Sequence, residues 1–221
     1  MNSLKLLMSY LQNRYQEVHI GNTSSEKLNI KTGVPQGSVL GPSLFILHIN
    51  DLPLHIEHSD IDIFADDATL QDSSNLPDSL SQNLQSDVNN VISWCKQNDM
   101  LLNERKTKCM LIGTSQKLSK CNSNLEIKVN DHYIENSKCE KLLGVHIDQK
   151  LSYENHIDYV CKNVSSKIAL LGRIKKFLPL QTRKLYYNAY ILSVIDYCLT
   201  VWGSASNGQL DILLKLQNHA S

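Results

Sequence analysis

The chain has 221 residues, 42% of them hydrophobic, which excludes a disordered chain and suffices for the core of one large domain or two small ones. The formal net charge is zero, but residues 51–100 contain one Lys or Arg against ten Asp or Glu, whereas residues 141–190 contain nine against three. An acidic segment therefore precedes a basic one, an order that suits metal binding followed by a phosphate backbone, although solvated faces would give the same counts.

The first thirty residues predict a helix followed by two short strands. Leucines recur at helical spacing, so we expect an amphipathic helix over residues 3–15. Short apolar runs in residues 18–22 and 28–30 then predict two strands around a polar turn at residues 22–25.

A loop punctuated by glycine and proline follows, with the sequence GVPQGSVLGP over residues 33–42. Pro35 removes a backbone donor, and the flanking glycines permit backbone angles and a close approach that other residues resist. Such a loop can contact something flat or anionic at short range, and a tight connector is the plain alternative. Pro42 suits the first turn of a helix, which we expect to continue to residue 49.

Two adjacent carboxylates, Asp66 and Asp67, close a short run from Ile61 to Ala65 in which every second residue would face the core. A second run over residues 68–71 follows at once. These features predict a tight β-hairpin with the acidic pair at its tip, where Asp accepts turn geometry and reaches water. Such a tip is a natural seat for a hard divalent cation. An ordinary solvated turn would show the same Asp-Asp pair.

The segment after this hairpin predicts a long helix and another hairpin. Apolar side chains recur at helical spacing from Leu80 to Trp94, so we expect a core-packing helix that ends near Lys96. Residues 125–129 alternate cleanly between apolar and charged, and Asn130-Asp131 then predicts a hairpin turn.

From Tyr153 onward the pattern predicts amphipathic helices, with Pro179 as the break between the first and the second. The expected apolar stripes are Ile157, Val160, Val164, Ile168 and Leu171 in the first helix, Leu185, Ala189, Leu192 and Ile195 in the second, and Leu210, Leu213, Leu214 and Leu216 in the third. The basic residues outside the first stripe are Lys162, Lys167, Arg173, Lys175 and Lys176.

The remaining patterns indicate neither a secreted nor a membrane protein. The six cysteines (Cys95, Cys109, Cys121, Cys139, Cys161 and Cys198) form no CxxC pair, and the histidines show no zinc spacing better than the weak pair His55 and His58. Met1 precedes a polar, amphipathic stretch, and no apolar run approaches the ~20 residues of a membrane span. We expect an intracellular protein with free thiols, nuclear or cytoplasmic, because no targeting signal is readable.

Three motifs together resemble a known family. The loop GVPQGSVLGP, then INDLP, then FADD, in this order and spacing, resemble the palm of a reverse transcriptase from non-LTR retrotransposons of the LINE or jockey-like kind. The resemblance implies an α+β fold: a right-hand polymerase palm, with an antiparallel sheet and packed helices, over residues 1–150, and an α-helical thumb, cut short, over residues 151–221. The fingers and the first palm strand would be missing, so that we expect an incomplete fragment.

The resemblance also implies roles for single residues. Asp66 and Asp67 would be catalytic and would bind Mg²⁺, with Mn²⁺ as an alternative; Asp66 would bridge two ions about 3.5–4 Å apart. Lys106, in a strand over residues 100–110 with the family's Asn-x-x-Lys-Thr, would face the triphosphate. A third carboxylate, the first catalytic Asp of the family, would lie on the missing strand.

Further implied contacts concern the nucleic acid. Template and incoming nucleotide would lie against Gly33, Pro35, Gln36 and Gly37. A hairpin over residues 141–148 would grip the primer end through Leu143 and Gly144. The thumb contacts would be Lys162, Lys167, Arg173, Lys175 and Lys176, with a sequence-independent, salt-sensitive affinity for phosphates.

Three functions compete on this basis. The first is an RNA-directed DNA polymerase, which copies RNA into DNA with an RNA template, a DNA primer, the RNA/DNA duplex and dNTPs as partners. The second is a non-catalytic nucleic-acid-binding remnant. The third is a Mg²⁺-dependent phosphohydrolase or a simple metal-binding module. For the chain by itself we expect weak Mg²⁺ binding and little or no polymerisation.

Overall fold

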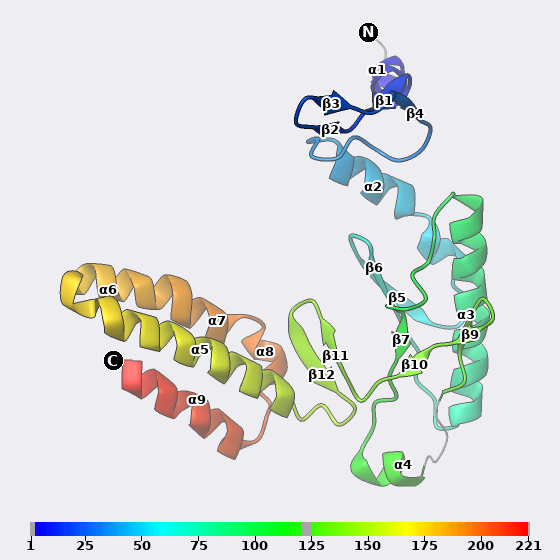
Figure 1. Ribbon diagram of the computed structural model, residues 1–221. Helices are drawn as coiled ribbons and strands as arrows, with labels where there is room; N and C mark the ends of the chain where they lie inside the picture. Colours follow the sequence, from blue (N-terminus) through cyan, green and yellow to red (C-terminus); the bar gives the residue numbers. More distant parts are fainter. Residues whose placement is uncertain (1–2, 121–124, 221) are drawn as a thin grey trace. The chain divides into compact units, whose positions relative to one another are not determined.

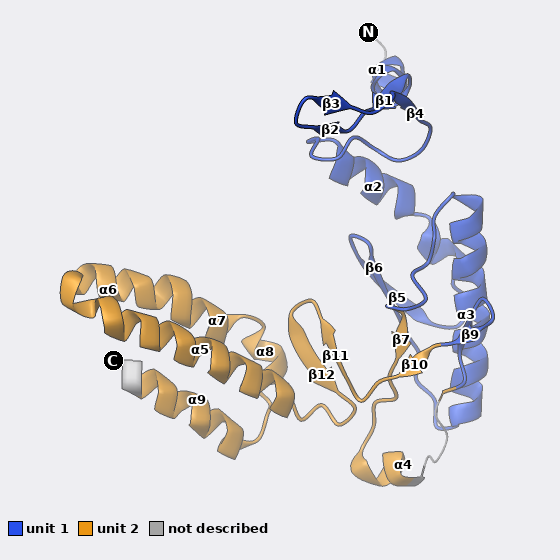
Figure 2. Cartoon of the chain, viewed as in Figure 1, with its two compact units in different colours: residues 1–106, 126–133 blue, residues 107–125, 134–221 orange. Residues whose placement is uncertain are grey.

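The computed structural model of the chain describes residues 3–120 and 125–220 (Figure 1). The chain forms two units, of which unit 1 comprises residues 1–106 and 126–133, and unit 2 comprises residues 107–125 and 134–221 (Figure 2). The chain therefore enters unit 2, returns briefly to unit 1 and then completes unit 2.

Helices mix with small two-stranded sheets, most of them antiparallel, so the α+β class is confirmed at that level. The assignment of palm and thumb stays a prediction. The contacts divide the chain elsewhere than after residue 150, because the hairpin over residues 139–148 belongs to the same unit as the C-terminal helices.

Unit 1 begins with α1 (Ser3–Leu11), β1 (Arg14–Gln16), β2 (His19–Ile20), β3 (Thr23–Ser24) and β4 (Leu28–Ile30). The helix expected over residues 3–15 ends at Leu11, because Asn13 adopts a left-handed conformation with φ of 55°. Beyond it the backbone turns into β1, which pairs antiparallel with β4.

The expected arrangement of two strands around a turn at residues 22–25 is wrong. The second of these strands, β4, pairs with β1, and part of the expected turn forms β3, which pairs with β2. The turn between β2 and β3 is Gly21-Asn22, where Gly21 has a φ of +60° that glycine adopts without steric cost.

The other elements of unit 1 are α2 (Gly41–Ile49), the 3₁₀ turn η1 (Leu52–His55), β5 (Asp60–Phe64), β6 (Asp67–Gln71), α3 (Pro77–Gln97), β8 (Lys128–Val129) and β9 (His132–Tyr133). Pro42 and Pro77 stand in the first turns of α2 and α3, where an N–H has no helical partner in any case. Both helices and the β8–β9 hairpin are confirmed. The core of the unit joins α2, η1 and α3 through Ile49, Leu52, Val91, Trp94 and Cys95.

The elements of unit 2 are β7 (Lys108–Cys109), α4 (Ser115–Lys120), β10 (Glu135–Asn136), β11 (Cys139–Leu142), β12 (Val145–Asp148), α5 (Glu154–Ile174), the 3₁₀ turn η2 (Lys175–Phe177), α6 (Leu180–Tyr186), the π-helical turn η3 (Tyr187–Leu192), α7 (Ser193–Asp196), α8 (Leu199–Trp202) and α9 (Asn207–Ala220). β7 and β10 pair in parallel, and β11 and β12 form an antiparallel hairpin. Helix α5 packs along α9 and against η3 and α7 (Figure 1).

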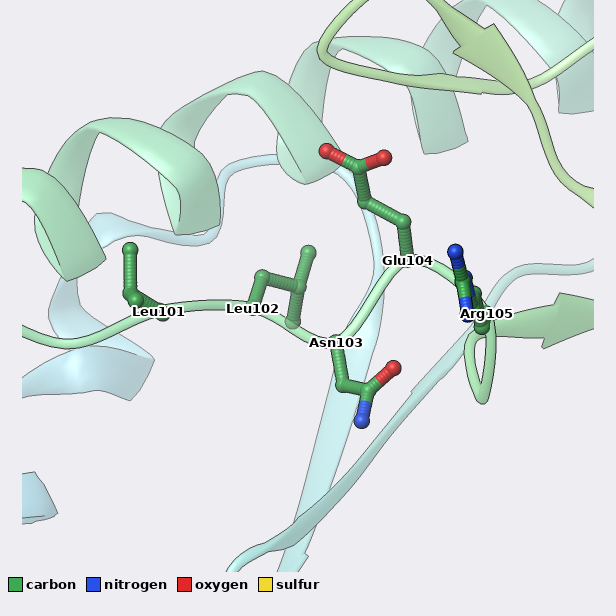
Figure 3. Close-up of a pocket in the computed structure, with 5 residues that line it drawn as sticks. All are labelled: Leu101, Leu102, Asn103, Glu104 and Arg105. Atoms are coloured by element: carbon green, nitrogen blue, oxygen red, sulfur yellow. The ribbon is translucent and has the colours of Figure 1, made fainter.

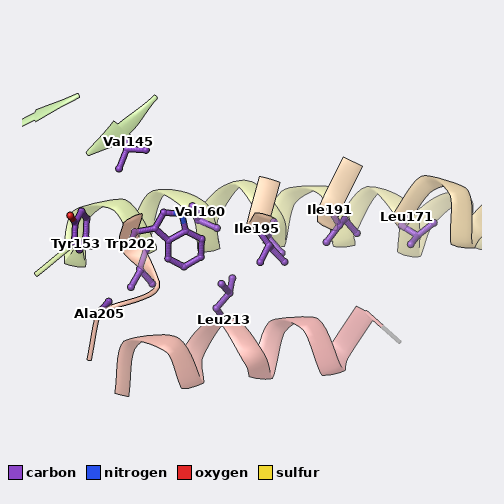
Figure 4. Close-up of a cluster of buried hydrophobic side chains, with 11 residues drawn as sticks. Val145, Tyr153, Val160, Leu171, Ile191, Ile195, Trp202, Ala205 and Leu213 are labelled. Carbon is purple, nitrogen blue, oxygen red and sulfur yellow. The ribbon is translucent and has the colours of Figure 1, made fainter. Parts of the chain in front are cut away.

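The core of unit 2 runs along α5 (Figure 4). The predicted stripe of α5 is confirmed, since Ile157, Val160, Val164 and Leu171 are buried and Ile168 packs against them. Trp202, Ile191 and Leu213 meet this stripe from α8, η3 and α9, and Val145 adds the hairpin. Burial of these large side chains stabilises the unit by about 1.5–3 kcal/mol for each one relative to its exposure.

The predicted stripe of the second C-terminal helix is partly wrong. Leu185 is 67% exposed and Ala189 is exposed, whereas Ile191 and Ile195 are buried. The π-helical turn η3 adds a residue to one turn and so rotates the apolar face after α6. In the third helix Leu213 is buried, but Leu214 points to solvent.

Among residues 3–120 and 125–220, no helix combines the length and the apolar character that a membrane span requires. Cys95, Cys109, Cys139, Cys161 and Cys198 are free thiols, and Cys121 lies outside the described residues.

Candidate functional site

The predicted acidic hairpin is formed by β5 and β6. Phe64 lies opposite Asp67 in the antiparallel ladder, which leaves Ala65-Asp66 as a two-residue turn with a φ of 53° at Ala65. Ala65 therefore belongs to the turn and not to the half-buried strand, whereas Asp66 stands at the tip and Asp67 opens β6. We call Asp66 and Asp67 the acidic turn.

The two faces of this hairpin differ in chemistry. Directly opposed residues share a face, so Ile61, Ile63 and Leu70 lie together and pack against the core of unit 1. The other face carries Asp62 and Asp67, together with Phe64, which is 63% exposed. The core thus fixes one face and leaves an acidic, solvent-exposed face free.

A buried carboxylate on α3 holds the segment that enters the hairpin. Asp87 is fully buried and accepts backbone N–H hydrogen bonds from Glu57 at 3.0 Å, His58 at 3.1 Å and Ser59 at 2.7 Å. Burial by itself raises the pKa of the Asp87 carboxyl, but these hydrogen bonds outweigh it and leave the pKa below its ordinary value. Asp87 therefore anchors the start of β5 as an ionised acceptor.

Sequence reasoning missed Asp87, although a signal was present. Asp87, Val91 and Trp94 follow the i, i+4, i+7 spacing of the buried face, so an acidic residue occupies a core position. A second polar anchor is Asp51 of INDLP, whose Oδ1 accepts a hydrogen bond from Trp94 Nε1 at 3.1 Å.

The loop of residues 33–37 is irregular, as predicted. Gly33 and Gly37 have φ of 74° and 76°, and Ser38 N–H bonds to the Pro35 carbonyl at 3.3 Å, so a turn presents Gln36 to solvent. The Gly33 carbonyl accepts a hydrogen bond from Arg14 Nη2 at 2.5 Å. Among the described residues, no hydrogen bond or ion pair joins this loop to the acidic turn.

Lys106 lies in a turn, not in the expected strand. Residues 104–106 turn back so that Lys106 N–H bonds to the Asn103 carbonyl at 3.1 Å, and regular pairing starts only at β7. The preceding residues line a shallow, open hollow (Figure 3): Leu101, Leu102, Asn103, Glu104 and Arg105. Glu104 accepts a hydrogen bond from Asn130 in the β8–β9 turn. The Lys106 side chain itself is exposed.

The hairpin expected over residues 141–148 is confirmed as β11–β12. Its tip is Leu143-Gly144, both with positive φ, 45° and 89°, as a two-residue type I′ turn requires. Tyr197 Oη donates a hydrogen bond to the Leu143 carbonyl at 2.6 Å. A Cβ added at Gly144 would lie 3.2 Å from the Tyr197 ring, so this close approach also favours glycine. Sequence reasoning did not single out Tyr197.

A histidine is buried behind this hairpin. His156 on α5 is 2% exposed; its Nδ1 accepts the His146 N–H at 3.3 Å, and its Nε2 has no hydrogen-bond partner within the described ranges. Burial, with His146 and Lys141 nearby, lowers the pKa of His156, so the ring is neutral at pH 7. It lies edge-on to Trp202, with ring centroids 5.5 Å apart.

The five predicted basic residues do not form a single face. Lys162 and Arg173 are eleven positions, or about three turns, apart on the side of α5 opposite the buried stripe. Lys167 is half-buried at the edge of that stripe. Lys175 and Lys176 are exposed in η2 beyond the end of α5.

Residues 2–147 match the family model described as "Reverse transcriptase (RNA-dependent DNA polymerase)". The chain is 28% identical to "Probable RNA-directed DNA polymerase from transposon BS" of Drosophila melanogaster, over 97% of the chain and 24% of that protein. It is 25% identical to "RNA-directed DNA polymerase from mobile element jockey" of the same species, over 96% and 24%.

A third relative is "Retrovirus-related Pol polyprotein from type-1 retrotransposable element R1 2" of Nasonia vitripennis, 23% identical over 77% of the chain and 43% of that protein. The chain spans about a quarter of the length of the first two relatives. No solved structure matches it.

Proposed function

The chain belongs to the reverse transcriptase (RNA-dependent DNA polymerase) family of non-LTR retrotransposons, and we propose that it supplies carboxylates of the active site and a nucleic-acid grip to an RNA-directed DNA polymerase. One observation carries the proposal: within the matched region, the acidic turn stands exposed at the tip of a hairpin whose other face is fixed by the core. A turn held in this way can present carboxylates in a constant geometry.

The acidic turn offers the type of ligand atom that suits Mg²⁺. Carboxylate oxygens are the ligands that Mg²⁺ prefers, and Asp66 and Asp67 are both exposed. Two carboxylates do not complete a site, and residues 3–120 and 125–220 contain no group of three His, Cys, Asp or Glu side chains that could hold a metal ion. The other ligands would be substrate phosphates, water and a carboxylate outside that set.

When bound, the metal would activate the primer 3′-hydroxyl and stabilise the leaving oxygen of the triphosphate. The residues of the chain do the rest. Asp66 and Asp67 would hold the metal through their carboxylates, with Asp67 also setting the local negative field, while Asp87 keeps β5 in place behind them. Lys106 offsets negative charge on the triphosphate.

We call the parts of the chain that would hold nucleic acid the grip: two glycine-containing turns, which act through their backbone, and the basic residues of unit 2. The turn at Gln36-Gly37 lies against the template and the incoming nucleotide, and the Leu143-Gly144 tip lies against the primer end, since glycine lets the backbone approach closely. Lys162, Lys167, Arg173, Lys175 and Lys176 contact duplex phosphates without reading sequence, Lys167 from a half-buried position.

A primer-extension assay tests the proposal. The purified chain and an Asp66→Asn, Asp67→Asn variant receive poly(rA)/oligo(dT), dTTP and Mg²⁺ or Mn²⁺, and binding of the same template–primer is measured by fluorescence anisotropy over a salt series. We expect tight, salt-sensitive binding by both proteins. Extension is expected to be absent or very weak, because the part of the chain that the structure describes brings no third carboxylate to the acidic turn that could complete a metal site.

The outcomes separate the parts of the proposal. If the wild type extends the primer and the double variant does not, the catalytic role of Asp66 and Asp67 is confirmed. That result would also show that the chain by itself supplies every protein ligand of the metal site. Extension by both proteins would overturn the role of the acidic turn. Absence of template–primer binding at low salt would overturn the grip.

A second function, binding of nucleic acid without chemistry, is favoured by the charge pattern of unit 2. Between Asp158 and Asp196 the chain has no acidic residue and seven Lys or Arg. This function predicts a steep loss of affinity with salt and no metal-dependent extension under any condition. A chimera separates it from the first function. When this chain replaces the matching segment of a jockey-like polymerase, the chimera extends a primer only if the acidic turn is catalytic.

A further inference from the structure

The turn between α5 and α6 concentrates positive charge. Five of the seven cations between Asp158 and Asp196 lie within residues 173–184: Arg173, Lys175, Lys176, Arg183 and Lys184. None of these five forms an ion pair with any residue in the described part of the chain. Unpaired cations gathered in one short segment attract anionic groups such as phosphates.

An aromatic side chain projects from the same turn. Phe177, the last residue of η2, is 85% exposed, and Leu180, the first residue of α6, is 64% exposed. A single exposed apolar side chain needs no explanation by itself. An exposed phenyl ring within a twelve-residue segment that carries five cations is different, because ring and cations together match the base and the phosphate of a nucleotide. We call this turn, with its five cations and Phe177, the basic tip.

The backbone of the basic tip is fixed. Leu178 packs against the core of unit 2, and its N–H bonds to the Lys175 carbonyl at 3.3 Å. Its carbonyl accepts a hydrogen bond from Arg183 Nε at 2.8 Å, and Arg183 N–H bonds to the Pro179 carbonyl at 3.1 Å. Since Leu178 is anchored inward, Phe177 is held outward, so a ligand would meet a ring that is already positioned.

We infer that the basic tip binds a nucleic-acid strand and that Phe177 stacks on an unpaired base of it. The cations hold the phosphates, and a phenyl ring stacks on any base without reading its edge. A base pair inside a duplex offers no free face, so the ligand is a single strand or the point where a single strand meets the duplex. This inference rests on the proposed function and adds Phe177, Arg183 and Lys184 to the predicted thumb contacts Arg173, Lys175 and Lys176.

A lipid surface is the rival ligand of similar charge. Two apolar side chains bury little area in a bilayer, whereas one ring suffices for one base, so the observations favour nucleic acid. The experiment keeps vesicles rich in phosphatidylserine as a separate arm.

The test compares Phe177→Ala with Leu185→Ala, a matched control that removes another exposed apolar side chain from the neighbouring helix α6. Both variants keep every charge. Fluorescence anisotropy measures their affinities for a short labelled single strand and for a duplex of the same length. We expect Phe177→Ala to weaken single-strand binding by about 5- to 100-fold, with an unchanged salt dependence, and duplex binding by less than about twofold. The control should resemble the wild type.

Phe177→Trp gives a direct signal. Trp94 and Trp202 are 2% and 0% exposed, so the new indole would be the accessible one among the described tryptophans. We expect quenching of its fluorescence on addition of the single strand and little change with duplex. Circular dichroism and thermal melting should be the same for all variants, since the side chain is exposed.

Three results would overturn the inference. Unchanged single-strand affinity in Phe177→Ala, with salt-sensitive binding intact, would refute the stacking and leave the proposed function standing. If Phe177→Ala loses binding to the phosphatidylserine vesicles but keeps its affinity for the single strand, the basic tip would be assigned to a membrane surface. Absence of any nucleic-acid binding by the wild type would refute both the inference and the grip.

Discussion

The two units hold their candidate binding elements by different means. In unit 1 the acidic turn depends on buried polar anchors, chiefly Asp87, behind a small core that joins three elements. In unit 2 the basic residues project from helices that share a long apolar core along α5. The difference teaches that polar anchoring fixes a loop in one geometry, whereas apolar packing fixes a helix and leaves its outer face free to carry charge.

Asp87→Ala should have the largest effect on this comparison. It leaves three backbone N–H groups without their acceptor, and we expect unit 1 to lose about 2–4 kcal/mol of unfolding free energy. Urea unfolding followed by hydrogen exchange and mass spectrometry distinguishes peptides of unit 1 from those of unit 2. Asp78→Ala, an exposed acidic residue on the same helix, is the control. If Asp87→Ala lowered protection from hydrogen exchange equally in both units, Asp87 would not be an anchor of unit 1 in particular.

Gly144→Ala should destabilise unit 2 by about 1–2 kcal/mol, because an alanine would be strained at a φ of 89° and would press on the Tyr197 ring. Gly172→Ala is a control of opposite sign. Gly172 lies in α5 with open space around an added Cβ, so alanine there should stabilise by about 0.5–1 kcal/mol. Thermal melting measures both, and a neutral Gly144→Ala would refute the close approach.

Acid should weaken unit 2 before unit 1. The pKa of His156 is lowered in the folded state, so between about pH 7.5 and 5.5, on either side of the ordinary histidine value, the unfolded chain takes up more proton than the folded chain, and stability falls as the pH falls. For one proton the slope is at most about 1.4 kcal/mol per pH unit. Asp87 and Asp148 have lowered pKa values, so their contributions are lost only at more acidic pH.

Urea unfolding at the two pH values measures this effect. His156→Phe should reduce the pH dependence of unit 2, and His132→Gln, an exposed histidine of β9 in unit 1, should leave it as in the wild type. A pH dependence that survives in His156→Phe would assign the effect to another group.

The acidic turn should show the smallest effect on stability. Asp66→Asn and Asp67→Asn each remove an exposed charge with no hydrogen-bond partner among the described residues, so we expect changes below about 0.5 kcal/mol. Denaturant midpoints measure them. A loss of stability above this value would mean that Asp66 and Asp67 contribute to the fold. The contrast within unit 1 between Asp87, which holds the fold, and the acidic turn, which faces solvent, would then fail.

Several elements could be predicted from local pattern alone. The acidic hairpin, the loop of residues 33–37, the helix after Pro42, α3 and the stripe of α5 all follow from period, turn chemistry or proline placement. The misses were of another kind. The phase of the second C-terminal helix depends on the π-helical turn, and the pairing of β1 with β4 joins residues that local periodicity does not relate.

The sequence by itself determined the family, the acidic turn and the basic segment, because motif order, turn residues and charge are properties of consecutive residues. Only the tertiary structure decided that Asp87 holds the entry to β5, that Tyr197 closes on the Leu143-Gly144 tip and that Phe177 points outward. The physical reason is that these features depend on contacts or burial that arise when segments pack, and hydrogen bonding and exclusion of water act on distance in space, whatever the separation along the chain.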